Sequence, residues 1–250
     1  MSVPERQGYV AEIFTSFQGE GACVGERHLF VRLAGCNIRC RYCDTPDSLE
    51  RTPRCRVDHG ADPSEWRDNP MSSAALRALI GAALACDPTI DAISFTGGEP
   101  LVQSAFLAEV LGAARLPVPV LLETNGVLPS QLGQVIEWID VVSMDIKPPS
   151  NTGERAFWDE HARFLAIAAQ GDVYVKLLVD SGTALAEVER AAALVAGAAP
   201  GAQMFLQPVS RPGGGVDITS SELTAFYSRA RSHCRKVRVL PQTHKMLGIQ

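Results

Sequence analysis

The sequence predicts an α/β protein built on a parallel sheet. Short apolar or β-branched segments alternate with helical ones from Leu29 onward, which is the pattern of parallel strands joined by helices. About six strand–helix repeats follow a cysteine-rich loop, fewer than the eight that close a (β/α) barrel. The pattern is therefore compatible with a partial barrel or with a doubly wound sheet.

The individual elements follow from local patterning. The expected strands cover residues 9–15, 28–33, 92–96, 118–123, 141–146, 173–179, 204–207 and 236–240. The expected helices cover residues 72–85, 101–115, 132–138, 154–169, 184–196 and 221–232. Two of these helices begin with capping signals, Ser72-Ser73 and Ser220-Ser221-Glu222.

Domain organisation is expected to be simple. Residues 46–70 are rich in proline, arginine and aspartate and lack periodicity, so we expect an inserted loop there. Neither flank of this loop looks self-sufficient without the other. We therefore expect one domain over residues 1–250, with an N-terminal extension over 1–27 and a C-terminal extension over 208–250.

Composition excludes several classes of protein. Of the 250 residues, 46% are hydrophobic and 20% are charged, which is too apolar for a disordered chain. The net charge of −5 argues against direct binding of nucleic acid. No apolar run reaches the roughly 18 residues of a membrane helix. The first residues lack the apolar core of a signal peptide, so we expect a cytoplasmic protein with reduced thiols.

Three of the seven cysteines form one motif. Cys36, Cys40 and Cys43 have the spacing C-x3-C-x2-C just beyond an apolar strand, and thiolates select zinc or iron–sulfur clusters. A structural zinc normally takes four protein ligands, so it would need Cys55 or His59 from the inserted loop. Three thiolates on a [4Fe–4S] cluster instead leave one iron open for chemistry. A zinc site and three unrelated buried thiols remain the alternatives.

A second motif lies at the end of a later strand. In Thr96-Gly97-Gly98-Glu99-Pro100 the glycines let backbone N–H groups approach a ligand, and Glu99 offers an acceptor for an ammonium group. With the cysteine motif before it, this turn resembles the radical S-adenosylmethionine (SAM) superfamily, over about residues 29–207. The resemblance implies a partial (β/α) barrel in which the three cysteines bind a [4Fe–4S] cluster and SAM chelates the open iron.

Polar side chains also end several other expected strands. Singly, each is typical of a turn, as Asn125-Gly126 is. Together, at the ends of successive parallel strands, they are typical of a barrel-top active site. By the resemblance, the SAM pocket is lined by Tyr42, Asp44, Gly98, Glu99, Glu123, Ser143, Asp145, Lys147 and Gln207.

Residues near both ends of the chain narrow the choice of enzyme family within the superfamily. Gln18 and Glu20 flank Gly19 in a loop that we expect to be polar and mobile, and an amide with a carboxylate can read the edge of a flat heterocycle. Arg32 can pair with a substrate carboxylate. These residues and the segment 238–245 resemble the 7-carboxy-7-deazaguanine synthase family of radical SAM enzymes. The implied substrate-binding residues are Phe17, Gln18, Gly19, Glu20, Arg32, Thr96, Asn125, His244 and Gln250.

That resemblance also implies cofactors and partners. Thr45 would bind Mg²⁺, the alternative being a capping hydroxyl in the turn after the cluster. The implied reaction is a lyase reaction in queuosine or other 7-deazapurine biosynthesis. It contracts 6-carboxy-5,6,7,8-tetrahydropterin to 7-carboxy-7-deazaguanine with loss of ammonia and regenerates SAM. No general acid or base is assigned.

The implied partners are a flavodoxin- or ferredoxin-like electron donor and a second copy of the chain in a homodimer, with no nucleic acid and no membrane. The competing hypotheses are another small radical SAM enzyme, such as a glycyl-radical activase, and a non-enzymatic zinc or iron–sulfur module.

Overall fold

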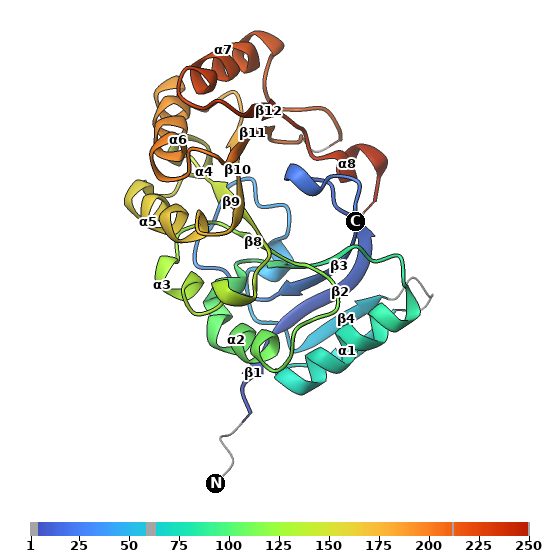
Figure 1. Ribbon diagram of the computed structural model, residues 1–250. Helices are drawn as coiled ribbons and strands as arrows, with labels where there is room; N and C mark the ends of the chain where they lie inside the picture. The colour runs from blue at the N-terminus through green and yellow to red at the C-terminus, as the bar shows by residue number, and fades with distance from the viewer. Residues whose placement is uncertain (1–4, 59–63, 212, 250) are drawn as a thin grey trace.

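A strongly curved ten-stranded sheet forms the centre of the molecule (Figure 1). The computed structural model describes residues 5–58, 64–211 and 213–249. His59 and Gln250, two residues considered above, lie outside the described residues. The strand order is β12-β11-β10-β9-β8-β7-β3-β2-β4-β5, so the two edges do not pair and the barrel stays open. The expected partial barrel is therefore confirmed.

Most of the sheet is parallel. Its parallel strands are β3 (Arg27–Leu33), β7 (Ala92–Gly97), β8 (Val120–Thr124), β9 (Val141–Ile146), β10 (Asp172–Val179), β11 (Gln203–Pro208) and β12 (Val237–Val239). The register of β9 and β10 pairs Asp145 with Lys176, and that of β8 and β9 pairs Glu123 with Ser143. Because parallel strands end at one edge, polar residues from separate repeats reach a common site.

The N-terminal part of the chain widens the sheet. β2 (Val10–Phe17) runs antiparallel to β3, and β4 (Arg54–Asp58) pairs parallel to β2. β5 (Glu65–Asp68) completes this edge by pairing antiparallel to β4. The expectation of an irregular loop over residues 46–70 was therefore wrong for these two strands. β5 is exposed along its whole length. Since neither of its faces is buried, its sequence lacks the alternation of apolar and polar residues that would indicate a strand.

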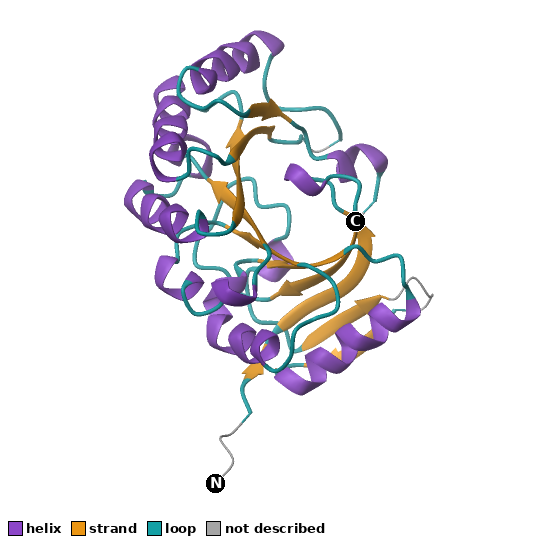
Figure 2. Cartoon of the chain, viewed as in Figure 1, coloured by secondary structure: helices purple, strands orange, loops and turns teal. Residues whose placement is uncertain are grey.

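Helices cover the convex face of the sheet, except the one nearest the C-terminus, which lies at the open side of the sheet where the cavity is (Figure 2). They are α1 (Ser73–Cys86), α2 (Ser104–Gly112), α3 (Pro129–Leu132), α4 (Pro149–Thr152), α5 (Trp158–Ala168), α6 (Leu185–Ala198), α7 (Ser220–Arg231) and α8 (Thr243–Leu247). Short 3-10 turns are η1 (Gly21–Cys23), η2 (Pro46–Ser48), η3 (Pro100–Gln103) and η4 (Ile136–Trp138). A small separate sheet pairs β1 (Gln7–Gly8) with β6 (Met71–Ser72).

The helix predictions hold with a few corrections. Ser72 caps α1 by accepting from the backbone of Ala75, as expected. The cap of α7 is Thr219, which forms a capping box with Glu222, and not one of the two serines. The single helix expected over 132–138 is instead α3 and η4, and α4 and α8 were not expected. These pieces are too short to show a helical period in the sequence.

The core lies between the sheet and its helices. Phe95, Leu122 and Leu177 are fully buried on successive parts of the sheet, and Leu107 and Phe164 bury the inner faces of α2 and α5. Among the described residues no helix combines the length and the hydropathy that a membrane span needs.

Candidate active site

A cavity of about 910 Å³ opens at the carboxyl ends of the parallel strands. The ends of β7, β8, β9 and β11 contribute Thr96, Glu123, Asp145 and Gln207 to its lining. The turn after β2, the cysteine loop and the segment that includes α8 line it as well. Three stretches that are far apart in the sequence therefore face one space.

The cysteine loop lies at this cavity. Cys36, Cys40 and Cys43 all line it, and each is partly exposed. The loop is fixed by Arg39, whose guanidinium donates to the carbonyl of Cys36 at 2.8 Å and whose backbone donates to Glu154 at 2.6 Å. Burial raises the pKa of the Cys40 thiol to about 11. Three thiols from one short loop are thus held at the mouth of the cavity.

The zinc alternative does not agree with this geometry. Cys55 lies on β4 with its side chain in the hydrophobic core and does not line the cavity. The sulfur atoms of Cys36, Cys40 and Cys43 do not all lie within 4.8 Å of one another. A tetrahedral zinc with bonds of about 2.3 Å requires sulfur atoms about 4 Å apart. Each thiolate of a [4Fe–4S] site binds a different iron, so wider spacing fits a cluster.

The turn after β7 brings the backbone close to the cysteine loop. A Cβ added at Gly98 would lie 2.5 Å from the carbonyl oxygen of Gly35 and 2.9 Å from the Cβ of Cys36, so glycine is required there. Glu99 is fully buried, does not line the cavity, and accepts from the backbone of Asn125 at 2.7 Å and from Thr124 at 2.9 Å. Burial raises the pKa of Glu99 to about 7. Its carboxylate therefore braces the turn instead of facing the open space.

Glu123 connects two predicted sites. Its Oε1 accepts from the side chain of Gln18 at 2.7 Å, and its Oε2 accepts from Thr96 at 3.1 Å. The amide oxygen of Gln18 accepts from the backbone of Glu20 at 3.0 Å. Gln18 is only 3% exposed, so the expectation of a mobile loop was wrong. Both ends of its amide have protein partners because the turn folds into the barrel.

A buried network of alternating charges crosses the cavity. Lys147 Nζ lies 2.9 Å from one oxygen of Asp145, and Lys176 Nζ lies 3.1 Å from the other. Lys176 also forms an ion pair with Glu20. Burial by itself would raise the pKa of Glu20, but the ammonium of Lys176 outweighs it and lowers that pKa to about 2. Glu20 is thus ionised and held in one position.

The C-terminal segment closes over the turn after β2. Thr243 donates its backbone N–H to the carbonyl of Gly19 at 2.9 Å. Gln242 donates to Glu20 at 2.7 Å and to Asp44 at 3.1 Å, and Lys245 reaches Asp44 at 2.8 Å. Figure 1 shows this segment and η1 side by side at the open face of the sheet.

The imidazole of His244 packs directly on Gly19. A Cβ at Gly19 would lie 2.2 Å from Nδ1 of His244. Burial lowers the pKa of His244 below its ordinary value. A neutral imidazole is therefore presented to the cavity, where it can both donate and accept a hydrogen bond.

Arg32 shares its carboxylate partner with a second arginine. Its Nε donates to Glu12 at 2.7 Å, and Glu12 also accepts from Arg56 at 2.6 Å. All three residues line the cavity, and Phe17 lies at its rim, 46% exposed. The free fork expected of Arg32 is thus partly engaged by Glu12, and a second guanidinium stands beside it.

The remaining predicted residues divide into two groups. Tyr42, Asp44, Thr45, Lys147 and Asn125 line the cavity. Ser143 is buried and does not line it. Asn125 also makes the turn that its dipeptide suggested, because its side chain accepts from the backbone of Val127 at 3.2 Å.

Comparison with known proteins agrees with this constellation. Residues 31–184 match the family model described as the radical SAM superfamily. A 7-carboxy-7-deazaguanine synthase of Geobacter sulfurreducens is 38% identical over 240 residues, covering 95% of this chain and 96% of the relative. One of Thermococcus kodakarensis is 33% identical over 259 residues, covering 96% and 98%.

The chain belongs to the 7-carboxy-7-deazaguanine synthase family of the radical SAM superfamily.

Solved structures confirm the fold of this synthase family member. The crystal structure of QueE from Escherichia coli superposes with a TM-score of 0.61 at 20% identity and covers 94% of each chain. A radical SAM methyltransferase from Sphaerobacter thermophilus gives a TM-score of 0.58 at 14% identity, covering 87% of this chain and 70% of the other. Both matches concern the architecture alone.

Radical SAM enzymes use a [4Fe–4S] cluster and SAM, and the residues of this synthase family member fit both groups. Three thiols reach the cavity and leave room for a ligand that is not a protein side chain. Gln207 and Tyr42 line the same cavity, and their buried Oε1 and Oη atoms have no hydrogen-bond partner among the described residues. A polar ligand in this space would supply the missing partners.

Thr45 is placed differently from a capping residue. It occupies the N-cap position of η2, yet its side chain makes no capping hydrogen bond. Thr45 lines the cavity. In the turn it is its backbone carbonyl that takes part, by accepting a hydrogen bond from Ser48 Oγ at 2.8 Å. The capping alternative therefore does not describe Thr45.

Two charged residues of this site were not predicted from the sequence. Lys176 is buried within a continuous apolar strand, and a lysine at such a position is itself a signal, because an unpaired charge there would be unstable. Arg56 lies in the segment interpreted as a loop, so nothing in the local pattern placed it opposite Arg32.

Proposed function

We propose that this chain contracts the ring of 6-carboxy-5,6,7,8-tetrahydropterin to 7-carboxy-7-deazaguanine with loss of ammonia. The single observation that carries the proposal is that one cavity joins the three-thiol loop to the Gln18, Glu20 and His244 side chains. A generic radical SAM enzyme needs the first feature only. The second offers hydrogen-bonding groups for a flat heterocycle.

The substrate-reading group in this proposal is Glu20. Both of its oxygens already accept one hydrogen bond or ion pair, from Gln242 and from Lys176. An ionised carboxylate has about four acceptor positions, so each oxygen keeps one for an N–H of the substrate. Because Glu20 stays ionised, it selects the donor edge of an aminopyrimidinone ring over an acceptor edge. His244, neutral and packed on Gly19, covers the same space.

Arg32 and Arg56 are proposed to hold the carboxylate of the substrate. They approach Glu12 from two directions, at 2.7 and 2.6 Å, and both line the cavity. Their shared contact with Glu12 fixes the two guanidinium groups in orientation before the substrate arrives. Such preorganisation lowers the entropy cost of binding.

At the other end of the cavity, Cys36, Cys40 and Cys43 would hold the [4Fe–4S] cluster. The cluster with SAM supplies the carbon radical that starts the reaction. Asp145 and Lys147 are proposed to orient the polar groups of SAM, and the buried Gln207 amide to complete its hydrogen bonds. With substrate and SAM bound, the side chains that line the cavity would keep bulk water from the reacting atoms, which protects reactive species from side reactions.

Two further partners complete the proposal. Thr45 Oγ1 would contribute one oxygen ligand to a Mg²⁺ ion that keeps several waters, since hydroxyl oxygen suits this hard cation. A flavodoxin- or ferredoxin-like protein would supply the electron, and the active form would be a homodimer.

The test is an anaerobic turnover assay with the reconstituted enzyme, SAM, a reductant and the carboxypterin, with and without Mg²⁺. We expect 7-carboxy-7-deazaguanine by mass spectrometry, stimulation by Mg²⁺, and far less 5′-deoxyadenosine than product because SAM is regenerated. Cys40→Ala should abolish turnover, whereas the matched Cys86→Ala, at an exposed thiol at the end of α1, should retain it. SAM cleavage without the deazaguanine would assign the chain to another radical SAM reaction.

A further inference from the structure

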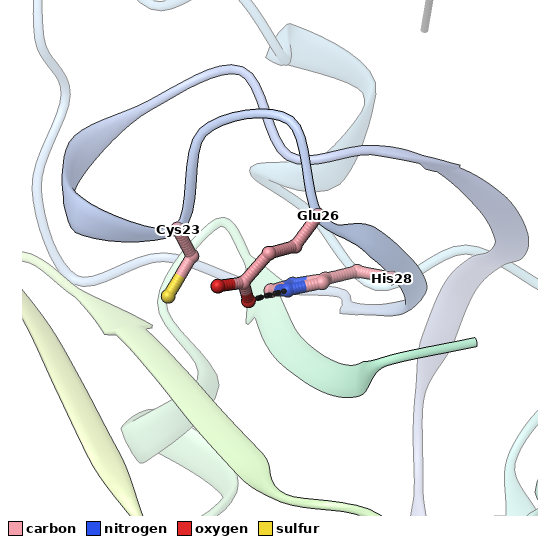
Figure 3. A group of neighbouring side chains, drawn as sticks. All are labelled: Cys23, Glu26 and His28. Carbon is pink, nitrogen blue, oxygen red and sulfur yellow. Dashed lines mark hydrogen bonds and ion pairs between the residues drawn. The ribbon is translucent and has the colours of Figure 1, made fainter. Parts of the chain in front are cut away.

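A second group of metal-ligating side chains lies outside the cavity. Cys23 ends η1, Glu26 follows it in the turn, and His28 is on β3. One ligand atom from each lies within 4.8 Å of the other two. In Figure 3 the carboxylate of Glu26 lies between the sulfur of Cys23 and the imidazole of His28. None of the three lines the cavity described above.

His28 is prepared for a ligand role by its neighbours. The residue is fully buried, Nδ1 lies 2.7 Å from Ser94 Oγ, and Nε2 lies 3.2 Å from Glu26. Without an ion, Nε2 can donate to Glu26 while Nδ1 accepts from Ser94; in the other tautomer Nδ1 donates to Ser94 and Nε2 presents its lone pair to Glu26. Two acceptors would then face each other, and a cation between them would satisfy both. A hydrogen bond on the far nitrogen is the usual support of a metal-bound histidine.

The ligand chemistry selects the ion. One thiolate, one imidazole and one carboxylate form a borderline-soft set that suits Zn²⁺, whereas Mg²⁺ and Ca²⁺ prefer oxygen alone. The Glu26 side chain is 49% exposed, so it can turn aside to admit an ion and leave a fourth position for water. Three protein ligands with a water in the fourth position is the arrangement of open zinc sites, whereas closed structural sites take four protein ligands, so the site proposed here is of the open type.

The turn that carries these residues is held by its own backbone. Glu26 donates to the carbonyl of Cys23 at 3.1 Å, Gly25 donates to that of Gln18 at 2.8 Å, and Gln18 donates to that of Glu26 at 2.8 Å. An ion bound across the turn would therefore act on Gln18, whose side chain meets Glu123 in the cavity.

We propose that Cys23, Glu26 and His28 form a zinc site that fixes the turn between β2 and β3. This site is distinct from the [4Fe–4S] site and does not depend on the proposed reaction. Its effect on the active site would be to hold Gln18 and Glu20 in place.

The test uses cluster-loaded, full-length protein so that iron already occupies Cys36, Cys40 and Cys43. The protein is dialysed against zinc chloride, and zinc and iron are measured in the same sample. We expect one zinc per chain in the wild type and at least tenfold weaker binding in Cys23→Ser and Glu26→Gln. Zinc should raise the melting temperature of the wild type and leave that of Cys23→Ser unchanged.

Matched controls separate this site from fortuitous binding. Cys86→Ser removes an exposed thiol, and His233→Gln removes a histidine that lies 3.5 Å from Glu189 but belongs to no group of three metal-ligating side chains among the described residues. Both should bind zinc as the wild type does. X-ray absorption at the zinc edge should show one sulfur among nitrogen and oxygen ligands. Equal zinc content in Cys23→Ser and the wild type, or a three-sulfur zinc site, would overturn the proposal.

Discussion

Lys176→Met should destabilise the protein far more than the loss of an ordinary lysine. The Lys176 side chain is only 4% exposed, and its ammonium contacts Glu20 and, at 3.1 Å, Asp145. Methionine fills a similar volume but leaves Glu20 without a cation. Asp145 keeps Lys147 at 2.9 Å, so Glu20 carries most of the effect.

The magnitude follows from the pKa of Glu20. Burial alone would raise it, and Lys176 lowers it from 4.5 to about 2. At 1.36 kcal/mol per pKa unit, this corresponds to about 3 kcal/mol of stability at neutral pH. Removal of one partner from a buried ion pair costs about 3–5 kcal/mol in other proteins, which agrees. Because the folded-state pKa is lowered, this stability is present above pH 4.5 and is lost as the pH falls toward 2.

Urea unfolding of the wild type and of the variant measures the difference. In Lys176→Met, burial raises the pKa of Glu20, so protonation relieves the uncompensated charge. The stability gap should therefore be widest at neutral pH and narrow as the pH falls through 4.5.

The matched control is Arg229→Met. It breaks an ion pair with Glu189 at 2.9 Å in which both side chains are 42% exposed, and it should cost less than about 1 kcal/mol. Adding Glu20→Gln to Lys176→Met should recover part of the loss. A loss below about 1 kcal/mol for Lys176→Met, or a gap that does not change with pH, would refute the reasoning.

Three other predictions concern single residues. Gly19→Ala places a methyl group 2.2 Å from Nδ1 of His244, and displacement of the imidazole should lower kcat/KM by about tenfold or more. The control is Gly81→Ala, where nothing lies within 4 Å of the added methyl group. It should raise the free energy of unfolding by about 0.5–1 kcal/mol. Burial raises the pKa of Glu99 from 4.5 to about 7, so unfolding titrations should show stability falling by about 3 kcal/mol from this group as the pH rises across that window. Glu99→Gln should remove that slope, and a slope unchanged in this variant would contradict the assignment. Thr45→Ala should weaken Mg²⁺ stimulation of turnover while iron content stays normal, and unchanged Mg²⁺ dependence would remove Thr45 from the metal site.

The parallel repeat could be predicted from the sequence because its central strands are buried on both faces; the edge strand β12 is mostly exposed. Strands such as β7 and β10 appear as apolar runs between helical patterns, and their order along the chain is their order in the sheet. The exposed strand β5 escaped notice because no buried face constrains its residues.

The sequence by itself determined the chemistry of the candidate site. Cys36, Cys40 and Cys43 are close in the chain, so their grouping needs no long-range contact, and Gly98 can be interpreted from its local turn. The family resemblance named the residues at both ends of the chain, but not their partners.

Only the tertiary structure decided how those residues act on one another. Lys176 meets Glu20 from a strand 156 positions away, and Gln242 meets it from 222 positions away. Glu99 turned out to brace a loop, and Arg32 to share Glu12 with Arg56. The physical reason is that the charge state and orientation of a buried group depend on its neighbours in space, and sheet curvature and strand register set those neighbours.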